Sequence, residues 1–507
     1  MIAAIDVGSN AMRAVVAYID AEGKPQPVDY QRAAVRLGQD VFQSGRISEE
    51  TTARAVEAMT RFRQLLDHHH VERWRAVGTS ALREAENSYE FISKINWATG
   101  LNLAAIGGDE EARLVFRAIA ARESLKGRTA LLIDIGGGSA EVSTVRNDRL
   151  VATESFKMGA VRLLELFGKQ TGGDAGALAK LARGYVQATR HRVAFAMGKK
   201  KIDLCFGVGG NIEALADLRT LVLKKKNDGA LGLQDLARLI DLLKGYTLEQ
   251  RVEKLALRPD RADVVLPAAV VLDFLLSQAK VRQVRVPRVN LKDGLLIELA
   301  RESTAPEQSL LRDQVLGAAR ELGARFLFDE RHAETVAGFA MRIFDATSSI
   351  HGLGSEDRLL LEAAAWLHDI GQFIGITDHH KHSAYILGAA PVIGLTPVQR
   401  NVVANIVRYH HKSFPKLRHE NFAALGDPDR ARVRKLVAIL RLADPLDFEH
   451  DSRLRLERIQ LDPSEKRLTM QFGPEGDSIL AKWAVYKHAG YFEDVFQVKV
   501  IVKNGDA

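Results

Sequence analysis

The sequence lacks paired cysteines, long hydrophobic runs and a recognisable leader. Its one cysteine, Cys205, excludes a disulfide framework and is typical of a reducing compartment, so we expect a cytoplasmic protein. The longest apolar stretch, residues 264–276, is interrupted by Pro267 and Asp273 and is too short to span a bilayer, so no membrane association is expected. Asp6 lies inside the first apolar run, which argues against a signal peptide.

The composition is that of an ordinary globular protein. Hydrophobic residues make up 46% and charged residues 27% of the 507 residues, enough for a sizeable core. A chain of this length should hold about three or four domains. The net charge of +7 favours an anionic partner. Nucleic acid, polyphosphate and an acidic membrane surface all fit this charge, although neither a specific nucleic acid nor a membrane is expected as partner.

Residues 133–142, Ile-Asp-Ile-Gly-Gly-Gly-Ser-Ala-Glu-Val, form a glycine turn between two predicted strands. The apolar run at residues 129–133 predicts a buried strand, and the alternation at residues 141–145 predicts a second one. Three glycines leave the backbone amides free to surround an anion. The second strand excludes a dinucleotide fingerprint, and the missing Gly-Lys-Ser/Thr ending excludes a Walker A loop. A simple tight hairpin remains the alternative.

The same pattern occurs near the N-terminus. Residues 5–10, Ile-Asp-Val-Gly-Ser-Asn, align with residues 133–138, and each turn leads into another apolar run. The aspartates of the two turns, Asp6 and Asp134, are 128 residues apart, about one domain length. We therefore interpret the chain as two related lobes. Each would offer an aspartate and a glycine turn to a shared cleft for a polyphosphate or nucleotide.

Two further strand–turn–helix segments carry charged residues. In residues 78–85 a glycine turn precedes a short helix with Arg83 in its first turns, and arginine suits phosphate because its donors form a planar fork. Further on, we expect Asp109 to cap a helix whose first turn holds Glu110 and Glu111. One of these acids would be placed to activate water in the cleft. Solvated surface helices are the alternative for both segments.

A third glycine turn and two basic runs follow. Residues 206–211, Phe-Gly-Val-Gly-Gly-Asn, place Gly209 and Gly210 in a turn after a predicted strand. The lysine runs at residues 199–201 and 224–226 are interpreted as solvated faces, with contact to a polyanion as the alternative.

The chain changes character at residues 301–306, the clearest domain boundary. Beyond it the pattern is almost wholly helical and histidines concentrate. His332, the adjacent pair His368 and Asp369, and the distant Asp444 lie on separate predicted helices. Together they can hold a divalent ion such as manganese, iron, zinc or nickel. Further histidines that could complete a second metal site or bind a phosphate are His382, His410 and His411. The alternative is a scaffold that serves only for packing or dimerisation.

With these residues, the chain resembles the bacterial exopolyphosphatase/guanosine pentaphosphate phosphohydrolase family. The motifs that carry the resemblance, in family order, are residues 6–10, 78–85, 110–113 and 134–141. The resemblance covers essentially the whole chain. It implies an α/β fold of the actin-like ATPase superfamily, with two RNase H-like lobes that face one cleft. The helical part resembles the HD metal-dependent phosphohydrolase domain.

Four domains are expected from the resemblance and from the changes of pattern. They are an N-terminal RNase H-like lobe at residues 1–125, a second RNase H-like lobe at 126–301, an all-α HD-like domain at 307–450 and a small α/β domain at 451–507. The resemblance also implies a homodimer.

By the resemblance, the cleft hydrolyses phosphoanhydride bonds with the help of Mg²⁺. Glu111 would act as the general base for the attacking water, and Glu141 would assist it or position the ion. Asp6 and Asp134 would hold the ion, and Arg83 would grip the substrate. The phosphate-binding residues would be Gly8, Ser9, Asn10, Gly137, Gly138, Ser139, Gly209 and Gly210.

Three positions depart from the family pattern and leave the substrate open. Ala11 and Asn211 stand where the family favours hydroxyl residues, and Lys292 stands where an arginine is expected. The sequence does not choose between inorganic polyphosphate and guanosine penta- or tetraphosphate. Two other functions remain open: a sugar or acetate kinase or ATPase of the same superfamily, and a regulatory protein that binds guanosine polyphosphates without turnover.

Overall fold

The duplicated glycine turns lie in two mixed sheets of matching topology. The first sheet has the strand order β3-β2-β1-β4-β5, and the second has the order β10-β11-β9-β6-β7-β8. In each, three antiparallel strands (β1 to β3, β6 to β8) adjoin two strands that run parallel to the first of them, and the second sheet adds β10, antiparallel to β11, at its edge. The strands are β1 (Ile2–Val7), β2 (Met12–Ile19), β3 (Pro25–Ala33), β4 (Arg73–Gly78), β5 (Leu103–Ala105), β6 (Thr129–Ile135), β7 (Ala140–Arg146), β8 (Arg149–Phe156), β9 (Leu204–Val208), β10 (Ala230–Gly232) and β11 (Gln283–Arg285).

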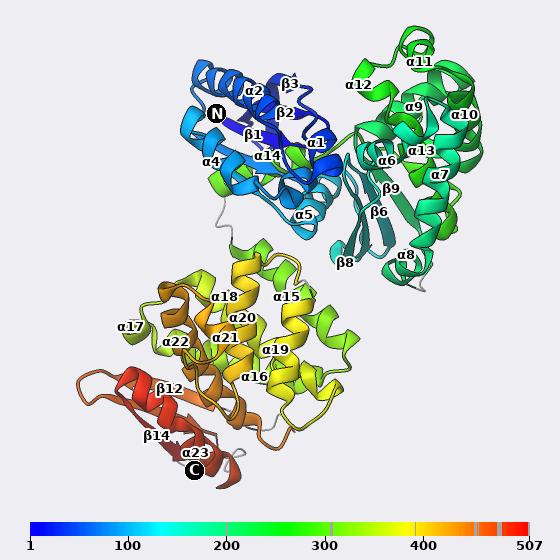
Figure 1. Cartoon of the computed structure of the whole chain (residues 1–507). Coiled ribbons are helices and arrows are strands. Elements are labelled where there is room, and N and C mark those ends of the chain that lie inside the picture. Colours follow the sequence, from blue (N-terminus) through cyan, green and yellow to red (C-terminus); the bar gives the residue numbers. More distant parts are fainter. Residues whose placement is uncertain are drawn as a thin grey trace. The chain divides into compact units, whose positions relative to one another are not determined.

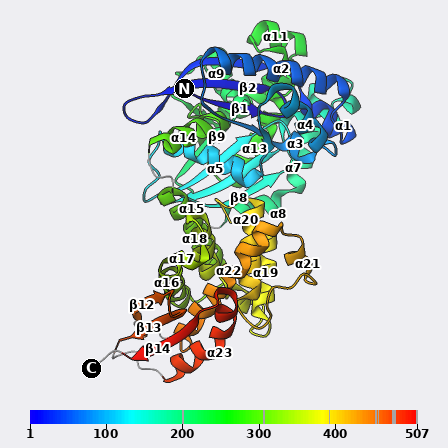
Figure 2. The same ribbon diagram turned by 90° about the vertical axis from the view of Figure 1, so that its left-hand side faces the viewer.

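Both sheets belong to the first of two units into which the chain divides. The computed structural model describes residues 1–198, 201–304, 308–390, 392–450, 454, 456–473 and 479–504. Unit 1 is Met1–Glu307 and unit 2 is Gln308–Ala507. Figures 1 and 2 show helices around the sheets of unit 1, and a mainly helical unit 2 that ends in a small sheet. The finer division into four domains remains a prediction.

Helices flank both sheets of unit 1. They are α1 (Leu37–Ser44), α2 (Glu49–His68), α3 (Ser80–Glu84), α4 (Ser88–Thr99), α5 (Gly108–Ala120), α6 (Ala160–Phe167), η1 (Lys169–Thr171), α7 (Ala175–Ala188), α8 (Arg190–Met197), α9 (Gly210–Leu223), α10 (Leu233–Gly245), α11 (Leu248–Leu255), α12 (Pro259–Ala262), α13 (Val265–Gln278) and α14 (Leu291–Thr304). Helix α5 begins at Gly108 with Gly107 as its N-cap. The expectation that Asp109 caps it was therefore wrong by two positions, although Glu110 and Glu111 do lie in its first turn.

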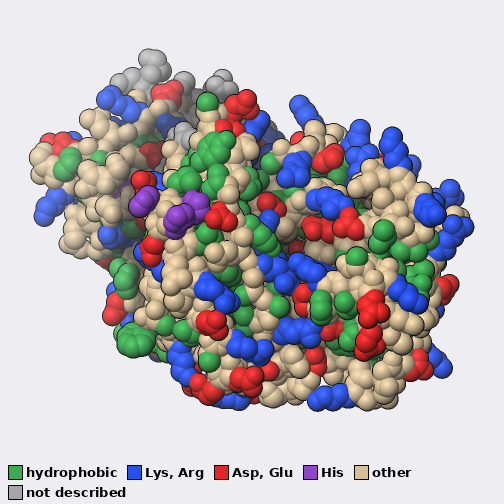
Figure 3. Space-filling view, turned by 90° about the horizontal axis from the view of Figure 1, so that it is seen from above, with side chains coloured by type: hydrophobic (Ala, Val, Ile, Leu, Met, Phe, Trp, Pro, Cys, Tyr) green, Lys and Arg blue, Asp and Glu red, His purple; other side chains and the backbone are tan. Residues whose placement is uncertain are grey.

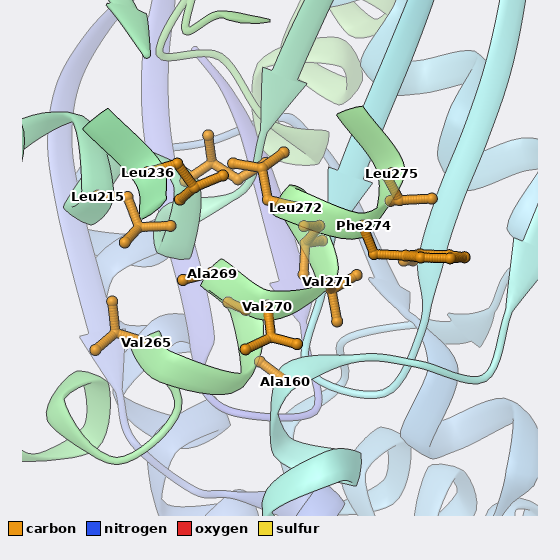
Figure 4. Packing of buried hydrophobic residues seen from close by; sticks show 14 of the residues in the cluster. Ala160, Leu215, Leu236, Val265, Ala269, Val270, Val271, Leu272, Phe274 and Leu275 are labelled. Carbon is orange, nitrogen blue, oxygen red and sulfur yellow. The ribbon is translucent and has the colours of Figure 1, made fainter. Parts of the chain in front are cut away.

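Helix α13 is the centre of the second lobe. Its run from Val265 to Leu272 is fully buried, since apolar residues occupy all sides of the helix. Figure 4 shows Val265, Ala269 and Leu272 of this helix among the side chains of α9 and α10. The stretch that is too short for a membrane span is thus a core helix. None of the helices in the described residues is long and apolar enough to cross a membrane.

The last helix of unit 1, α14, returns to the first sheet. Its apolar face packs with Ile2 and Ala4 of β1 and with Leu114 of α5. Gly294 permits this close packing, because a Cβ there would lie 2.1 Å from the carbonyl oxygen of Leu114. The buried guanidinium of Arg113 pairs with Glu298 of α14. The chain therefore crosses from the second lobe back to the first before unit 1 ends.

Unit 2 is a bundle of helices followed by a three-stranded sheet. Its helices are α15 (Gln308–Arg325), α16 (Glu330–Ala346), α17 (Ser348–His351), α18 (Ser355–Leu367), η2 (Ile370–Phe373), α19 (His379–Ala389), α20 (Pro397–Tyr409), α21 (Glu420–Ala423), α22 (Asp427–Ala443), η3 (Asp444–Asp447) and α23 (Ile479–Phe496). The sheet order is β12-β13-β14, with β12 (Leu456–Asp462), β13 (Arg467–Phe472) and β14 (Lys499–Asn504). The expected small α/β end of the chain is confirmed.

Candidate active site

Four carboxylates of unit 1 come from the ends of strands and the start of a helix. Asp6 and Asp134 lie near the ends of β1 and β6, and Glu141 lies at the start of β7. Across the second hairpin, Asp134 pairs with Glu141 in the strand register. Glu111 reaches the same place from the first turn of α5. The structure therefore brings together acids that the sequence places more than a hundred residues apart.

Three of these acids are close enough to share one cation. One carboxylate oxygen from each of Glu111, Asp134 and Glu141 lies within 4.8 Å of the others. The side chains are well shielded, with exposed fractions of 7% for Glu111 and 1% for Glu141. Among the described residues, no group hydrogen-bonds to Glu141 Oε2. A buried oxygen without a donor and two neighbouring carboxylates suit a hard divalent ion such as Mg²⁺.

The pKa values of these acids reflect burial and mutual repulsion. Burial, followed by the charge of Glu141, raises the pKa of Glu111 to about 8. Burial and the charges of Glu111 and Asp6 raise the pKa of Asp134 to about 8. The pKa of Glu141 rises to about 7, mainly by burial and then by the charge of Asp134. Ionised acids at this spacing need a compensating cation, because each charge disfavours the next.

Arg83 supplies part of that compensation. Its Nη1 donates hydrogen bonds to Glu111 Oε2 at 3.0 Å and to the carbonyl oxygen of Ile106 at 2.9 Å. Its Nη2 lies 3.9 Å from Glu141 Oε1. Arg83 thus contacts two acids and does not line the cavity described below. Its expected grip on the substrate stays a prediction.

The glycine turns of the two lobes approach each other closely. A Cβ at Gly137 would lie 2.9 Å from Cβ of Ser9 and 3.4 Å from the amide nitrogen of Asn10. Gly209 has φ of +100°, and a Cβ there would lie 2.8 Å from the carbonyl oxygen of Ile135. Glycine is therefore needed at both positions for close approach.

A cavity of about 540 Å³ lies where these turns meet. Of the residues predicted from the sequence, those that line it are Asp6, Gly8, Ser9, Asn10, Glu111, Asp134, Gly137, Gly209 and Gly210. The predicted residues that do not line it are Arg83, Gly138, Ser139 and Glu141. Gly138 lies against Ser80, and Glu141 Oε1 accepts a hydrogen bond from Ser155 Oγ at 2.8 Å.

Six basic residues line the same cavity, and the sequence analysis singled out only Lys292 among them. The five that it missed are Arg13, Arg32, Arg258, Arg261 and Arg288. Burial, with the charges of Arg13 and Arg258, lowers the pKa of Arg261 to about 10. Like charges packed this closely favour an anionic ligand. Asp6 compensates Arg13, whose Nη1 lies 2.8 Å from its Oδ2.

The lysine runs do not belong to this set. None of residues 224–226 lines the cavity, and Lys225 pairs with Asp235 at 2.7 Å. Residues 199 and 200 of the other run lie outside the described residues. On the face drawn in Figure 3, Lys and Arg side chains are interspersed with Asp and Glu. The described residues of both runs therefore lie outside the cavity.

The register of the first hairpin could have revealed one of the missed residues. Arg13 pairs with Asp6 in the strand register, seven residues further along the chain, as Glu141 pairs with Asp134. Aligning the two turns would thus have placed Arg13 at the position of Glu141. The sequence carries no comparable signal for Arg258 and Arg288, which enter the cavity from loops of the second lobe.

Unit 2 has a second cluster of ligands, built from the residues predicted for it. His332 comes from α16, His368 and Asp369 follow α18, and Asp444 begins η3. The Nε2 atoms of His332 and His368 lie 3.7 Å and 3.5 Å from Asp444 Oδ1. His368 Nε2 lies 3.7 Å from Asp369 Oδ2. The structure therefore brings this predicted set together.

The carboxylates of this cluster are held ionised. Despite burial, the charge of His368 and the nearby imidazoles of His379 and His410 keep the pKa of Asp369 well below its usual range. The pKa of Asp444 is likewise low, because the neighbouring imidazoles of His332 and His368 outweigh burial. Two ionised carboxylates and several imidazoles form a donor set that fits a divalent transition metal.

Comparison with known proteins decides the family. A family model described as the Ppx/GppA phosphatase family matches residues 15–303, which is more than half of the chain. The chain belongs to the Ppx/GppA phosphatase family. A second model, Ppx/GppA phosphatase domain III, matches residues 316–481. The resemblance inferred from the turn motifs is thereby confirmed, whereas the HD-type assignment of unit 2 remains a prediction.

Two related pyrophosphatases match nearly the whole chain. A guanosine-5'-triphosphate,3'-diphosphate pyrophosphatase of Vibrio vulnificus is 27% identical over 475 residues, covering 92% of this chain and 91% of that protein. The protein of the same name from Photobacterium profundum is 26% identical and covers 89% of this chain and 87% of its own length.

Solved Ppx/GppA structures support the fold. An exopolyphosphatase from Cytophaga hutchinsonii is 25% identical with a TM-score of 0.54, and covers 59% of this chain and 98% of its own. The Aquifex aeolicus family member is 25% identical with a TM-score of 0.51, and covers 60% of this chain and 99% of its own. The expected actin-like ATPase fold, with a helical region and a small C-terminal sheet after it, is confirmed.

Proposed function

We propose that unit 1 hydrolyses the terminal phosphoanhydride bond of inorganic polyphosphate, and that guanosine pentaphosphate is a second substrate. The observation that carries the proposal is one cavity with Glu111 and Asp134 on its wall together with six basic residues. Acids that can hold an ion and activate water lie beside cations that can neutralise a chain of phosphates. This combination is what phosphoryl transfer to water requires.

In this proposal Glu111 is the general base. A water oxygen forms a bond to the terminal phosphorus, and the phosphorus–oxygen bond to the next phosphate breaks. The electron pair of that bond stays on the shortened chain, and the proton of the water passes to Glu111. A pKa of about 8 suits a base that works near neutral pH. Arg83 keeps the Glu111 carboxylate oriented through its 3.0 Å hydrogen bond.

Mg²⁺ held by Asp6, Asp134 and Glu141 would supply charge compensation for the phosphate oxygens. The turns around Gly8 and Gly137 would orient the terminal phosphate, because both line the cavity with unobstructed backbone. The basic residues would bind the remainder of the chain. Their number favours a substrate with several phosphates.

Phosphate release from long-chain polyphosphate and from guanosine pentaphosphate, measured side by side with Mg²⁺, tests this function. Release from either substrate supports the hydrolase, and the ratio of kcat/KM values defines the preference. ATP consumption that depends on an added sugar or carboxylate would identify a kinase instead. Binding of guanosine polyphosphates without phosphate release would identify a regulatory protein.

A second proposal concerns unit 2. We infer that His332, His368, Asp369 and Asp444 hold a divalent cation, because ligand atoms of His332, His368 and Asp444 lie within 4.8 Å of one another and Asp369 Oδ2 lies 3.7 Å from His368 Nε2. Elemental analysis of protein purified without chelator tests it, with His368→Ala/Asp369→Ala as the comparison. Equal metal content in the two proteins would leave unit 2 as a scaffold. We also expect a homodimer, which sedimentation can test.

A further inference from the structure

The carbonyl oxygens of the second glycine turn accept hydrogen bonds from the start of helix α6. The backbone amides of residues 160–161 donate to the carbonyls of Gly136 and Gly137 at 3.0 Å and 2.8 Å. The side chain of Arg162 continues this row, because its Nε donates to the Gly138 carbonyl at 2.7 Å. Three consecutive peptides of the turn are therefore held from the side of α6.

The same bonds decide where the amides of the turn point. In a trans peptide the N–H lies opposite the carbonyl oxygen of the preceding residue, so the amides of Gly137, Gly138 and Ser139 point away from α6. In the part of the chain that the structure describes, the amides of Gly137 and Gly138 donate no backbone hydrogen bond. Free amides of successive residues are donors for an anion, and Gly137 lines the cavity. The bonds on the side of α6 thus keep these donors available to a phosphate.

Arg162 also joins the turn to the first lobe. Its Nη2 donates to Glu84 Oε1 of α3 at 2.5 Å, and its Cζ lies 4.0 Å from the ring centroid of Phe42 on α1. The residue is buried, with an exposed fraction of 9%. A guanidinium stacked on an aromatic face and bound at two edges has little freedom to move. The side chain that holds the Gly138 carbonyl is therefore itself held by the other lobe.

Glu84 is the sequence neighbour of Arg83, which contacts the proposed general base. Arg83 Nη1 donates to Glu111 Oε2 at 3.0 Å, and Ser80 Oγ donates to Glu84 Oε1 at 3.1 Å. The short helix α3 thus holds Glu111 through one residue and the turn of the second lobe, by way of Arg162, through the next. The distance from the base to a phosphate on that turn depends on both contacts.

We propose that Arg162 is a positioning residue, which keeps the amides of the second glycine turn directed at a phosphate and, through Glu84, aligns that phosphate with Glu111. It acts through the turn and does not touch the substrate, because it does not line the cavity. The alignment with Glu111 rests on the proposed hydrolysis, whereas the orientation of the turn does not.

The kinetic test uses Arg162→Met in the full chain, with long-chain polyphosphate and Mg²⁺. The variant keeps an apolar stem over Phe42 but removes the donors to Gly138 and Glu84. Its kcat should fall roughly 10- to 100-fold, the cost of a misplaced reacting group. Its KM should change little, since the basic residues of the cavity bind most of the chain. A residue that only stabilised the fold would not separate kcat from KM in this way.

A double-mutant cycle with Glu84→Ala tests whether the two residues act together. Arg162→Met/Glu84→Ala should lose less kcat than the product of the two single losses, because either substitution already breaks the link between the lobes. Losses that multiply would overturn the alignment through Glu84. The melting temperature of each variant shows whether it is folded. If Arg162→Met is not, Arg162→Lys replaces it, since lysine lacks the planar fork that reaches both partners.

A binding test does not need turnover. Imidodiphosphate, whose phosphorus–nitrogen bridge resists hydrolysis, is titrated into each variant by calorimetry. Arg162→Met should bind it more weakly than the wild type, because a short anion depends on the amides of the turn. A wild type that binds imidodiphosphate but releases no phosphate from either substrate would contradict the proposed function alone. Unchanged affinity in Arg162→Met would overturn the orientation of the turn by Arg162.

Lys157→Met is the matched control. Lys157 also pairs with Glu84, at 3.2 Å, but its side chain is 71% exposed and does not reach the turn. Removing this cation should leave kcat and the affinity for imidodiphosphate close to the wild type. Equal losses in Lys157→Met and Arg162→Met, or an unchanged kcat in Arg162→Met, would overturn the proposal.

Discussion

Asp134 lies directly opposite Glu141 across the β6–β7 hairpin. The equivalent position in the β1–β2 hairpin pairs Asp6 with Arg13. The β6–β7 hairpin thus carries two acidic residues, whereas the β1–β2 hairpin carries one acidic residue and one arginine. The first arrangement is suited to a cation, and the second brings a positive charge to the cavity. Under the proposed function, this asymmetry between the related lobes would let one cleft serve both an ion and a phosphate.

Glu111→Gln should lower kcat for phosphate release by roughly 100-fold or more, the usual contribution of a general base. The amide keeps the size of the side chain but cannot take the proton from water. Steady-state phosphate release measures the effect. The control is Glu110→Gln on the same helical turn, where the native acid pairs with Arg113 at 2.6 Å and does not line the cavity. The kcat of Glu110→Gln should stay close to that of the wild type. An equal loss of kcat in both variants would rule out Glu111 as the general base.

Stability of the metal-free protein should decrease as pH rises toward 8. The pKa of Glu141 is about 7 in the folded chain against an ordinary value of 4.5. The folded state therefore holds more protons than the unfolded state between these pH values, and the free energy of unfolding falls across that window. Melting temperatures in chelator at several pH values measure this. Glu141→Gln should make the melting temperature depend less on pH. An equally steep fall with pH in this variant would contradict the role given to Glu141.

Affinity for long polyphosphate should fall steeply with salt, because several basic residues bind the chain at once. Short oligophosphates should show a shallower dependence. For long chains, Arg258→Gln should reduce the slope of log affinity against log salt concentration by about one, the contribution of a single phosphate contact. Lys226→Gln is the control of equal charge change outside the cavity, and it should leave the slope as it was. Equal slopes for long and short chains would refute a multi-contact site.

The double variant His368→Ala/Asp369→Ala should lose bound metal from unit 2 but keep phosphate release from polyphosphate. The reason is that the proposed catalytic acids all belong to unit 1. Metal content and kcat are measured on the same preparation. A parallel loss of both would show that the hydrolysis depends on unit 2.

Much of the local structure follows from short-range patterns. Alternating and β-branched runs predict the strands around Asp6 and Asp134, because side-chain direction repeats every two residues in a strand. The glycine turns follow from the need for open backbone between those strands. The helix start near Asp109 was predicted two positions late, since Gly107 provides the N-cap without a side chain. Such boundary errors arise because glycine gives a weak capping signal.

The sequence by itself determined the duplicated hairpins, the acids on them, and the ordered set of His332, His368, Asp369 and Asp444. Only the tertiary structure decided which distant residues meet. Arg258 and Arg288 enter the cavity from loops, and His379 rather than His382 faces His410. Such contacts between residues that are distant in the sequence depend on how helices and sheets pack. Packing is set by the sum of many contacts rather than by any local motif. The raised pKa of Glu111 has the same origin, because burial against Glu141 exists only once the lobes have folded.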